Sequence, residues 1–314
     1  MNPSPSIVFM GTPDFAVPSL QALHKGPFKI RLVVTQPDRP KGRGRRLAPP
    51  PVKRAAQSMA LEIAQPPKVH APSFIEHLQS VAPDFLVVVA FGQILPASVL
   101  DLPTRCAVNV HASLLPKYRG PAPIHWALLR GEKETGVTTM IMDLGVDTGD
   151  ILLTARTPIA PEDTTGSLHD RLARMGGELL PETLLGLWNG MLYPRAQRHA
   201  EATYAPALKK EDGRMNWHQP AEQLDAFVRG MTPWPGAFCF WNGRRLGILK
   251  VRAVPDAHSD APPGIVLPAF ADELRIAAGK GVVSIIEIQS PSGKRLAIKD
   301  FLHGHKMEPG TRLE

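Results

Sequence analysis

The chain has 314 residues, which is about right for two domains. Hydrophobic residues make up 43% and charged residues 21%, so the chain can bury a core, and no stretch approaches the ~20 apolar residues that span a bilayer. The formal net charge of +7 favours an anionic partner, nucleic acid above all, although it is also compatible with simple solubility.

The first half of the chain alternates short apolar runs with helical patterns. Continuous apolar runs of this length are typical of parallel strands that are buried on both faces of a sheet. The alternation predicts a doubly wound α/β domain. The predicted strands are 7–10, 29–35, 84–90, 107–111 and 137–142, and the predicted helices include 51–61, 75–79, 124–130 and 167–189. The turn after the first strand, Gly11 to Phe15, is not the glycine-rich phosphate turn, so nicotinamide and flavin dinucleotides are disfavoured.

The pattern changes after residues 190–207, a polar stretch without periodicity that we interpret as a linker. Beyond it, short apolar runs alternate with turn signals, and Asn242-Gly243 between two such runs predicts a β-hairpin. A small β-barrel fits this pattern. The expected organisation is a first domain at 1–189, the linker, and a second domain at 208–314.

The two cysteines, Cys106 and Cys239, stand far apart and in no metal-binding spacing, so neither a disulfide framework nor a zinc site is expected. The amino terminus lacks the basic and apolar segments of a signal peptide. We therefore expect a cytoplasmic protein. No heptad seam occurs in the sequence, and we expect a monomer.

Asn109 and His111 are the first candidate catalytic residues. They stand two apart on a predicted strand, so their side chains share one face, and they lie at its carboxyl end, where open α/β sheets place their ligands. An amide donor beside an imidazole can stabilise a developing oxyanion and transfer a proton. The alternative is a polar strand end that caps a neighbouring loop.

A second candidate is the loop from Met142 to Asp150, which follows the fifth predicted strand and should reach the same edge. Asp147 in this loop could orient His111 or accept a proton through it. Two other interpretations remain open. The three acids of the loop could bind magnesium or calcium, although their spacing does not match an EF-hand, or they could form an ordinary Asp-rich turn.

A third candidate is a basic run that contains five positive charges within eight positions. Glycine and proline interrupt it, so it cannot pack a core, and we expect a solvated loop. Such a loop is either plain surface or a flexible arm that follows a phosphate backbone. Its basic residues are Arg39, Lys41, Arg43, Arg45 and Arg46.

Several motifs together resemble the 10-formyltetrahydrofolate-dependent formyltransferase family. They are Asn109-Val110-His111, Ser113-Leu114-Leu115-Pro116, Tyr118-Arg119-Gly120 and Asp147-Thr148-Gly149. Three further runs resemble the members of that family that act on methionyl-tRNA: 9–15, 35–40 with the basic run that follows it, and 234–237. The resemblance extends over nearly the whole chain. The ordered set of motifs makes it specific, although each motif alone would be weak.

The resemblance implies a Rossmann-like catalytic domain, a linker, and a C-terminal barrel that is similar to an OB-fold and binds tRNA. It implies transfer of a formyl group from 10-formyltetrahydrofolate to the amino group of methionyl-initiator tRNA, for translation initiation, by chemistry that requires no metal. It also implies site residues. The catalytic set is Asn109, His111 and Asp147, the folate-binding set is Ser113, Leu114, Leu115 and Pro116, and the tRNA-binding set is Arg39, Lys41, Arg43, Arg45 and Arg46.

Three other functions would share part of this pattern. A formyltransferase acting on an amino-sugar nucleotide is expected to carry a large second catalytic domain, for which the residues after the linker are too few. A hydrolase that releases formate from the folate would need the same three catalytic residues and no tRNA. A non-catalytic tRNA-binding protein would not need the intact set of Asn109, His111 and Asp147.

Overall fold

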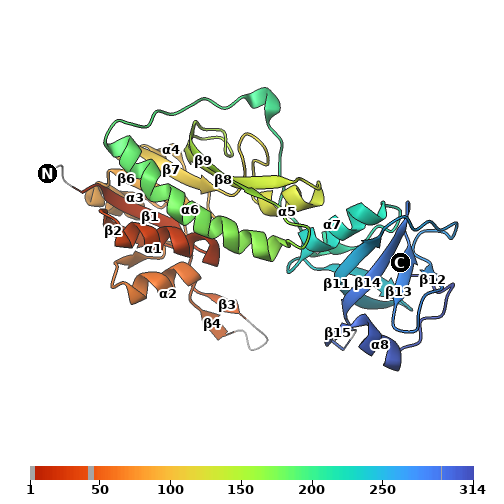
Figure 1. Cartoon of the computed structure of the whole chain (residues 1–314). Helices are drawn as coiled ribbons and strands as arrows, with labels where there is room; N and C mark the ends of the chain where they lie inside the picture. Colours follow the sequence, from red (N-terminus) through yellow and green to blue (C-terminus); the bar gives the residue numbers. More distant parts are fainter. Residues whose placement is uncertain (1–3, 42–45, 291) are drawn as a thin grey trace. The chain divides into compact units, whose positions relative to one another are not determined.

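The computed structural model describes residues 4–41, 46–290 and 292–314, and the chain forms two compact units (Figure 1). The first unit comprises Met1–Pro123, Glu134–Thr157 and His169–Tyr204. The second comprises Ile124–Lys133, Pro158–Leu168 and Ala205–Glu314. Two short segments of the predicted first domain, 124–133 and 158–168, therefore belong to the second unit, which no sequence pattern indicates.

A seven-stranded sheet forms the centre of the first unit, in the order β5-β2-β1-β6-β7-β8-β9. Five strands from β5 to β7 pair in parallel, which confirms the Rossmann-like fold class. The strands are β1 (Ser6–Gly11), β2 (Lys29–Val34), β5 (Ile63–Ala64), β6 (Phe85–Val89), β7 (Cys106–His111), β8 (Glu134–Ile141) and β9 (Ile151–Pro158).

The direction of β8 differs from the expected one. The fifth predicted strand corresponds to β8, which runs antiparallel to β7, so that Thr138 lies opposite His111 and Ile141 opposite Val108. A parallel neighbour requires a crossover along the face of the sheet, usually a helix. The segment between β7 and β8 contains only the seven-residue helix α5 (Pro123–Leu129), most of which belongs to the second unit, and the chain returns antiparallel.

Helices cover both faces of this sheet (Figure 1). Val8 and Met10 of β1 share a core cluster with Leu78 of α3, while the alternate residues Ile7 and Phe9 are equally buried on the other face. The continuous apolar strands are thus buried on both sides, as their pattern predicted. The helices are α1 (Val17–Lys25), α2 (Pro51–Ser58), α3 (Pro72–Val81), α4 (Ala97–Leu100) and α6 (Thr165–Trp188), with short 3₁₀ helices at Asp14–Ala16 and His199–Glu201; a further 3₁₀ helix, Lys210–Gly213, belongs to the second unit. None of the helices described here has the length and apolar composition needed to cross a membrane.

The second unit is built on a curled antiparallel sheet in the order β10-β11-β14-β13-β12, with β15 paired to β14. The predicted hairpin is confirmed, because Trp241 pairs with Arg244 across Asn242 and Gly243, which both have positive φ. The elements are β10 (Ala237–Trp241), β11 (Arg244–Val254), β12 (Val266–Leu267), β13 (Leu274–Ala277), β14 (Val282–Gln289), β15 (Arg295–Ala297), α7 (Ala221–Met231) and α8 (Ile298–Gly304).

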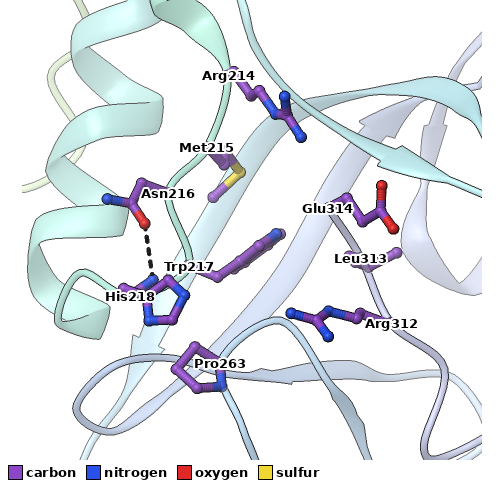
Figure 2. A pocket seen from close by; sticks show the side chains of 9 residues that line it. All are labelled: Arg214, Met215, Asn216, Trp217, His218, Pro263, Arg312, Leu313 and Glu314. Atoms are coloured by element: carbon purple, nitrogen blue, oxygen red, sulfur yellow. Dashed lines mark hydrogen bonds between the residues drawn. The ribbon is translucent and has the colours of Figure 1, made fainter.

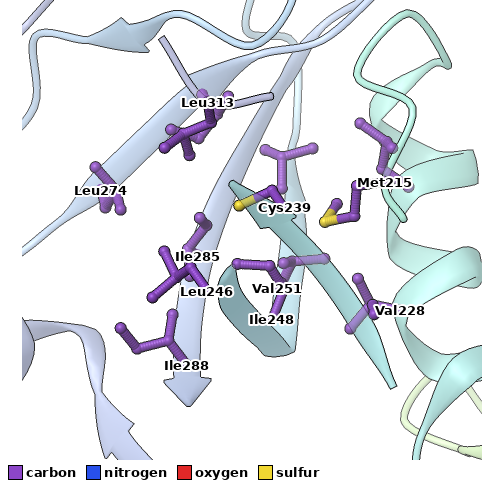
Figure 3. Packing of buried hydrophobic residues seen from close by; sticks show 14 of the residues in the cluster. Met215, Val228, Cys239, Leu246, Ile248, Val251, Leu274, Ile285, Ile288 and Leu313 are labelled. Carbon is purple, nitrogen blue, oxygen red and sulfur yellow. The ribbon is translucent and has the colours of Figure 1, made fainter. Parts of the chain in front are cut away.

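One apolar cluster fills the inside of this curled sheet (Figure 3). Val228 of α7 packs there with residues from the strands, among them Cys239 and Ile285. The last residues of the chain bond to both edges of the sheet. Leu313 donates to the Gly264 carbonyl beside β12, and Glu314 exchanges two backbone hydrogen bonds with Phe240 of β10. These bonds cover the two edge strands and give the sheet its barrel-like form.

Candidate active site

Asn109 and His111 project from one face of β7 near its carboxyl end. Ala107, two residues earlier on that face, belongs to the core cluster that includes α3 and α4. Val88, next to the last residue of β6, already pairs with Asn109, so His111 extends beyond the end of β6. The packed face therefore ends at Asn109, which is partly exposed, and two polar side chains lie at the edge where α/β sheets place their ligands.

His111 has only 6% of its surface exposed, and both of its ring nitrogens face oxygen atoms. Nε2 lies 2.9 Å from the carbonyl oxygen of Tyr118, and Nδ1 lies 3.5 Å from Oδ2 of Asp147. A carbonyl oxygen only accepts hydrogen bonds, so Nε2 carries the hydrogen and donates a hydrogen bond to the Tyr118 carbonyl. This hydrogen bond fixes the orientation of the ring. The other nitrogen, Nδ1, faces Asp147 and is the one that can take part in proton transfer.

Asp147 contacts both residues of β7 through its carboxylate. Oδ1 accepts a hydrogen bond from Asn109 Nδ2 at 3.4 Å, and Oδ2 accepts one from the backbone N–H of Gly120 at 2.8 Å. The Asp147 side chain keeps 17% of its surface exposed, so the carboxylate is held on two sides and still reaches solvent. The structure thus brings the three candidate catalytic residues together. Their groups can polarise a carbonyl oxygen and move a proton.

The loop that carries Asp147 arrives by an unexpected route. Because β8 is antiparallel, its end at Ile141 lies short of the carboxyl end of β7, and the loop then turns back toward the cluster. Asp143 stabilises this turn by accepting hydrogen bonds from the Gly145 N–H at 3.1 Å and the Thr148 hydroxyl at 2.7 Å. The Asp143 carboxylate therefore stabilises the conformation of the loop that contains it. Within the described ranges, no three His, Cys, Asp or Glu side chains are grouped so as to hold a metal ion.

Two residues of the cluster adopt backbone conformations that are rare for residues with a side chain. Tyr118 has a φ of 62° and Asp147 a φ of 52°. Such a conformation costs of order 1–3 kcal/mol and persists only where the surroundings hold it. The Tyr118 carbonyl and the Asp147 carboxylate are the two groups that face the nitrogens of His111, so the strain coincides with the placement of the imidazole.

Sequence reasoning missed two groups that hold the Asp147 loop. One is the backbone N–H of Gly120, and the other is the side chain of Gln197, which lies in the predicted linker. Gln197 Nε2 donates to the carbonyl oxygens of Asp147 at 2.9 Å and Gly149 at 2.7 Å. No local signal marks Gln197, because its partners lie about fifty residues away in the sequence.

The four predicted folate-binding residues form a turn after β7. Ser113 and Leu115 are buried, with 1% and 6% of their surface exposed. Thr138 fixes the turn by donating to the Ser113 carbonyl at 2.7 Å and accepting from the Leu115 N–H at 3.2 Å. Leu114 and Pro116 are partly exposed. These two offer surface to a ligand, while the other two shape the turn.

Exposed apolar side chains flank the candidate catalytic carboxylate. Leu144 and Val146 lie in the same loop as Asp147 and have 74% and 61% of their surface in contact with solvent. Large apolar groups that protrude from a loop beside a polar cluster are typical of a surface that a ligand covers.

Neither cysteine provides a nucleophile. Burial raises the pKa of Cys106 to about 11, against a smaller opposing effect of Arg105, and burial raises the pKa of Cys239 to about 12. Both thiols are therefore protonated near neutral pH, and the thiolate is the reactive form.

Three of the predicted tRNA-binding residues, Arg39, Lys41 and Arg46, fall on a β-hairpin of the first unit, in which β3 (Arg39–Lys41) pairs antiparallel with β4 (Arg46–Ala48). The flanks of the expected loop are thus paired strands. Arg39 Nη2 donates to Gln36 Oε1 at 3.3 Å. Two of the other four residues lie outside the described ranges: Arg43 and Arg45. The remaining two are placed here by their backbone alone: Lys41 and Arg46.

An anchored carboxylate stands at the base of this hairpin. Asp38 accepts hydrogen bonds from Gln65 Nε2 at 2.8 Å and from Lys53 Nζ at 2.8 Å. These two bonds lower the pKa of Asp38, the bond from Gln65 having the larger effect. Asp38 stays ionised and ties the start of the hairpin to α2 through Lys53.

The second unit presents arginines that were not in the predicted site. Arg214 and Arg312 lie on opposite sides of Trp217 around a cavity of about 440 Å³ (Figure 2). Arg245 stacks on the ring of Phe238 with its guanidinium carbon 3.7 Å from the ring centroid. A stacked guanidinium has a fixed orientation and keeps donors free for a phosphate.

Comparison with known proteins decides the family. A family model described as formyl transferase matches residues 6–184, and one described as formyl transferase, C-terminal domain matches residues 207–306. Methionyl-tRNA formyltransferases of Citrifermentans bemidjiense and Geotalea uraniireducens are both 50% identical to this chain over 307 residues, which is 98% of this chain and 96% and 97% of theirs. The chain belongs to the methionyl-tRNA formyltransferase family.

The fold of this formyltransferase also occurs in an N-formyltransferase that was solved with a sugar nucleotide. The N-formyltransferase from Helicobacter canadensis, solved with folinic acid and dTDP-3-aminofucose, is 18% identical with a TM-score of 0.68. The likeness covers 89% of this chain and 97% of the other, so that protein carries no large additional domain. The expectation that size separates this chain from amino-sugar formyltransferases was therefore wrong. The identity over the full chain separates them instead.

Proposed function

We propose that this enzyme transfers the formyl group of 10-formyltetrahydrofolate to the α-amino group of methionine carried on initiator tRNA. The observation that carries the proposal is the cluster of Asn109, His111 and Asp147, in an enzyme whose relatives at about half identity are methionyl-tRNA formyltransferases. The reaction moves a formyl carbon from one nitrogen to another, and one proton moves in the opposite direction.

Asn109 stabilises the negative charge that develops on the formyl oxygen. Its amide nitrogen carries two hydrogens, and only one of them is directed at Asp147, so the second is available to the substrate. His111 adds a positive charge beside that oxygen when Nδ1 is also protonated. A donor placed in advance at such a position typically contributes about 10²–10³-fold in turnover.

Asp147 transfers the proton between the attacking amine and the leaving folate nitrogen. The attacking amine loses a proton as its bond to the formyl carbon forms, and the leaving folate nitrogen gains one as its bond to that carbon breaks. The Asp147 carboxylate is partly exposed and adjacent to His111, so it can accept the first proton and return it, directly or through His111. No step of this sequence requires a metal ion.

We place the folate donor beside the Ser113–Pro116 turn and the loop that carries Asp147. Leu114 and Pro116 offer partly exposed surface, while Ser113 and Leu115 support the turn from within. The exposed side chains of the Asp147 loop suit a flat aromatic ring. The folate supplies the activated formyl group, and the protein supplies position and electrostatics.

We assign tRNA to the basic hairpin and to the second unit. The basic run of the sequence contains Arg39, Lys41, Arg43, Arg45 and Arg46, and the second unit carries the adjacent Arg244 and Arg245, of which Arg245 stacks on Phe238. Both suit a phosphate backbone. We propose that residues 1–189 hold the folate and the acceptor end, that 190–207 connect the units, and that 208–314 hold the body of the tRNA. The enzyme acts as a cytoplasmic monomer in this proposal.

The test is a formyl-transfer assay with initiator and elongator methionyl-tRNA, each with and without the folate donor. The expected result is formylmethionyl-tRNA from the initiator tRNA and much less from the elongator. Formate release should be slow when tRNA is omitted. Rapid formate release that tRNA does not redirect would identify a folate hydrolase instead. A formylated amino-sugar nucleotide without formylated tRNA would identify a sugar formyltransferase.

A further inference from the structure

The catalytic imidazole is held by two strained residues, and one chain segment contacts them both. Tyr118 and Asp147 have positive φ, and they face the two nitrogens of His111. Gln197 bonds to the backbone of the Asp147 loop, and the Thr203 hydroxyl accepts the Tyr118 N–H at 2.9 Å. Residues 197–203 belong to the stretch that the sequence marks only as a connection.

Every polar atom of the Gln197 side chain is used. Oε1 accepts hydrogen bonds from Arg119 Nε at 3.1 Å and Nη2 at 2.7 Å, while Nε2 donates to the carbonyl oxygens of Asp147 and Gly149. Because guanidinium only donates and carbonyl oxygens only accept, one orientation of the amide satisfies all four bonds. Gln197 itself has 6% of its surface exposed.

Arg119 sets the orientation of that amide. It has 2% of its surface exposed, and its guanidinium contacts Gln197 and His199 Nδ1. Within the described ranges it forms no ion pair with a carboxylate. Desolvating a cation that only an amide and an imidazole hold is costly, so Arg119 contributes little to global stability, and its effect is on the groups that it orients. Its next neighbour, Gly120, donates to the Asp147 carboxylate.

We propose that Gln197, oriented by Arg119, is a positioning residue for formyl transfer: it holds the backbone of the Asp147 loop so that the carboxylate faces Asn109 and His111. The Gln197 side chain bonds to the Arg119 guanidinium and to backbone carbonyls, so it would act through the loop and not as a catalytic group itself. This inference rests on the proposed function, because the chemistry that Asp147 performs is the one proposed above. A displacement of the carboxylate by about 1 Å can cost on the order of 10²-fold in rate.

Gln197→Glu separates positioning from folding. The new carboxylate keeps Oε1 as an acceptor and gains an ion pair with Arg119, so the buried cation remains satisfied. It loses the two donors and directs a negative oxygen at the carbonyls of Asp147 and Gly149, which pushes the loop away. We expect turnover to fall roughly 10- to 100-fold, with an unchanged Michaelis constant for tRNA and an unchanged melting temperature. The Michaelis constant for folate, which borders the same loop, should rise by much less than turnover falls.

Two variants serve as controls. Gln223→Glu makes the same chemical change at an exposed position on α7. His199→Ala removes the other contact of Arg119 and leaves all four bonds of Gln197 in place. Both should retain turnover within about twofold of the unaltered enzyme.

A double variant distinguishes positioning from general structure. In an Asp147→Asn enzyme the carboxylate is already gone, so adding Gln197→Glu should lower the remaining turnover by less than about twofold. A merely structural role would lower turnover by the same factor in both backgrounds. That multiplicative result would overturn the proposal.

Hydrogen exchange tests the geometry without activity. Gln197→Glu should speed the exchange of the Gly120 amide and of the amides in the Asp147 loop, while the strands of the sheet stay protected. If the unaltered enzyme transfers no formyl group, the proposed function fails. If it is active and Gln197→Glu shows normal turnover or unchanged exchange at Gly120, the positioning role fails and the proposed function stands.

Discussion

The ring of His111 has an acceptor on each side, and this pair of neighbours defines what the residue can do. The Tyr118 carbonyl holds a proton on Nε2, and the Asp147 carboxylate faces Nδ1. The first contact fixes the orientation of the ring, and the second places the candidate proton acceptor beside Nδ1.

Replacement of Asn109 or His111 by Ala is expected to lower turnover by about 10²–10³-fold each, because each removes one donor at the oxyanion. Asp147→Asn keeps the shape of the side chain and loses its charge, and should also be slow. Turnover is measured with saturating folate and tRNA, and folding is checked by circular dichroism. His24→Ala, on the exposed side of α1, is the control. Normal turnover in both Ala variants would remove these residues from the chemistry.

Asp84 provides a residue-level test of stability. Burial alone opposes its ionisation, but hydrogen bonds from the Ser6 N–H and hydroxyl and from the Thr104 hydroxyl outweigh burial and lower its pKa. A carboxyl with a lowered pKa stabilises the fold above its unfolded pKa of about 4, and the contribution disappears as the pH falls through the folded value. These bonds join the amino ends of β1 and β6.

Asp84→Asn should therefore lower the free energy of unfolding by roughly 1–3 kcal/mol at pH 7, and the difference from the unaltered protein should shrink below about pH 4. Urea unfolding at pH 7, 5 and 3.5 measures it. Asp101→Asn, at an exposed helix end, is the matched control and should change little. A difference that is constant with pH would show that the ionised form of Asp84 is not what stabilises the strands.

The sequence predicted the position of a side chain where the periodicity of a strand determines the face on which that side chain lies. Asn109 and His111 could be placed on one face because side chains alternate along a strand. Asp147 could be associated with them through the resemblance. Gln197 and Thr203 could not be found, because their roles depend on contacts with residues 50 and 85 positions away that no local pattern encodes.

At the scale of elements, the parallel strands were predictable because they are apolar on both faces, and β8 was not. Its composition suits either direction, and its direction depends on the short excursion between β7 and β8. The hairpin of β10 and β11 was predictable from Asn242 and Gly243, since both adopt the positive φ that such a turn requires. Strand identity therefore follows from local composition, and strand direction follows from the path of the chain.

The basic hairpin of β3 and β4 is the element expected to meet tRNA. Arg43→Ala should raise the Michaelis constant for charged tRNA and leave folate binding unchanged. Neutralising Arg43, Arg45 and Arg46 together should lower the slope of log affinity against log salt by up to about 3. Neutralising Lys25, Lys29 and Arg31, which are exposed on α1 and β2, removes equal charge as a control. An unchanged slope of log affinity against log salt in the triple variant would show that these arginines do not contact tRNA.

At the scale of the whole molecule, the two units are interleaved along the chain. The second unit includes 124–133 and 158–168, and Thr165 of the latter donates to the carbonyl of Gly230 in α7 at 2.6 Å. A truncation after Tyr204 would leave both segments without their partners, so it would test folding together with tRNA binding. The contribution of the second unit is better measured in the full chain.

Arg244→Gln with Arg245→Gln is the full-chain test of the second unit. Loss of two phosphate contacts should weaken tRNA affinity roughly 10-fold at moderate salt and lower the salt slope by up to about 2, while folate binding stays constant. Lys25→Gln with Lys29→Gln, in the first unit, removes the same charge as a control. If the two double variants bind tRNA equally well, this face of the barrel does not hold tRNA.

The most direct test of the account is a single-turnover experiment with 10-formyltetrahydrofolate labelled in the formyl group, excess enzyme and methionyl-initiator tRNA. The unaltered enzyme should place the label on the methionine nitrogen, and Asp147→Asn should do so at least about 10-fold more slowly while it binds both substrates normally. Label recovered as formate, or equal rates in the two enzymes, would contradict the assignment of formyl transfer to the cluster of Asn109, His111 and Asp147.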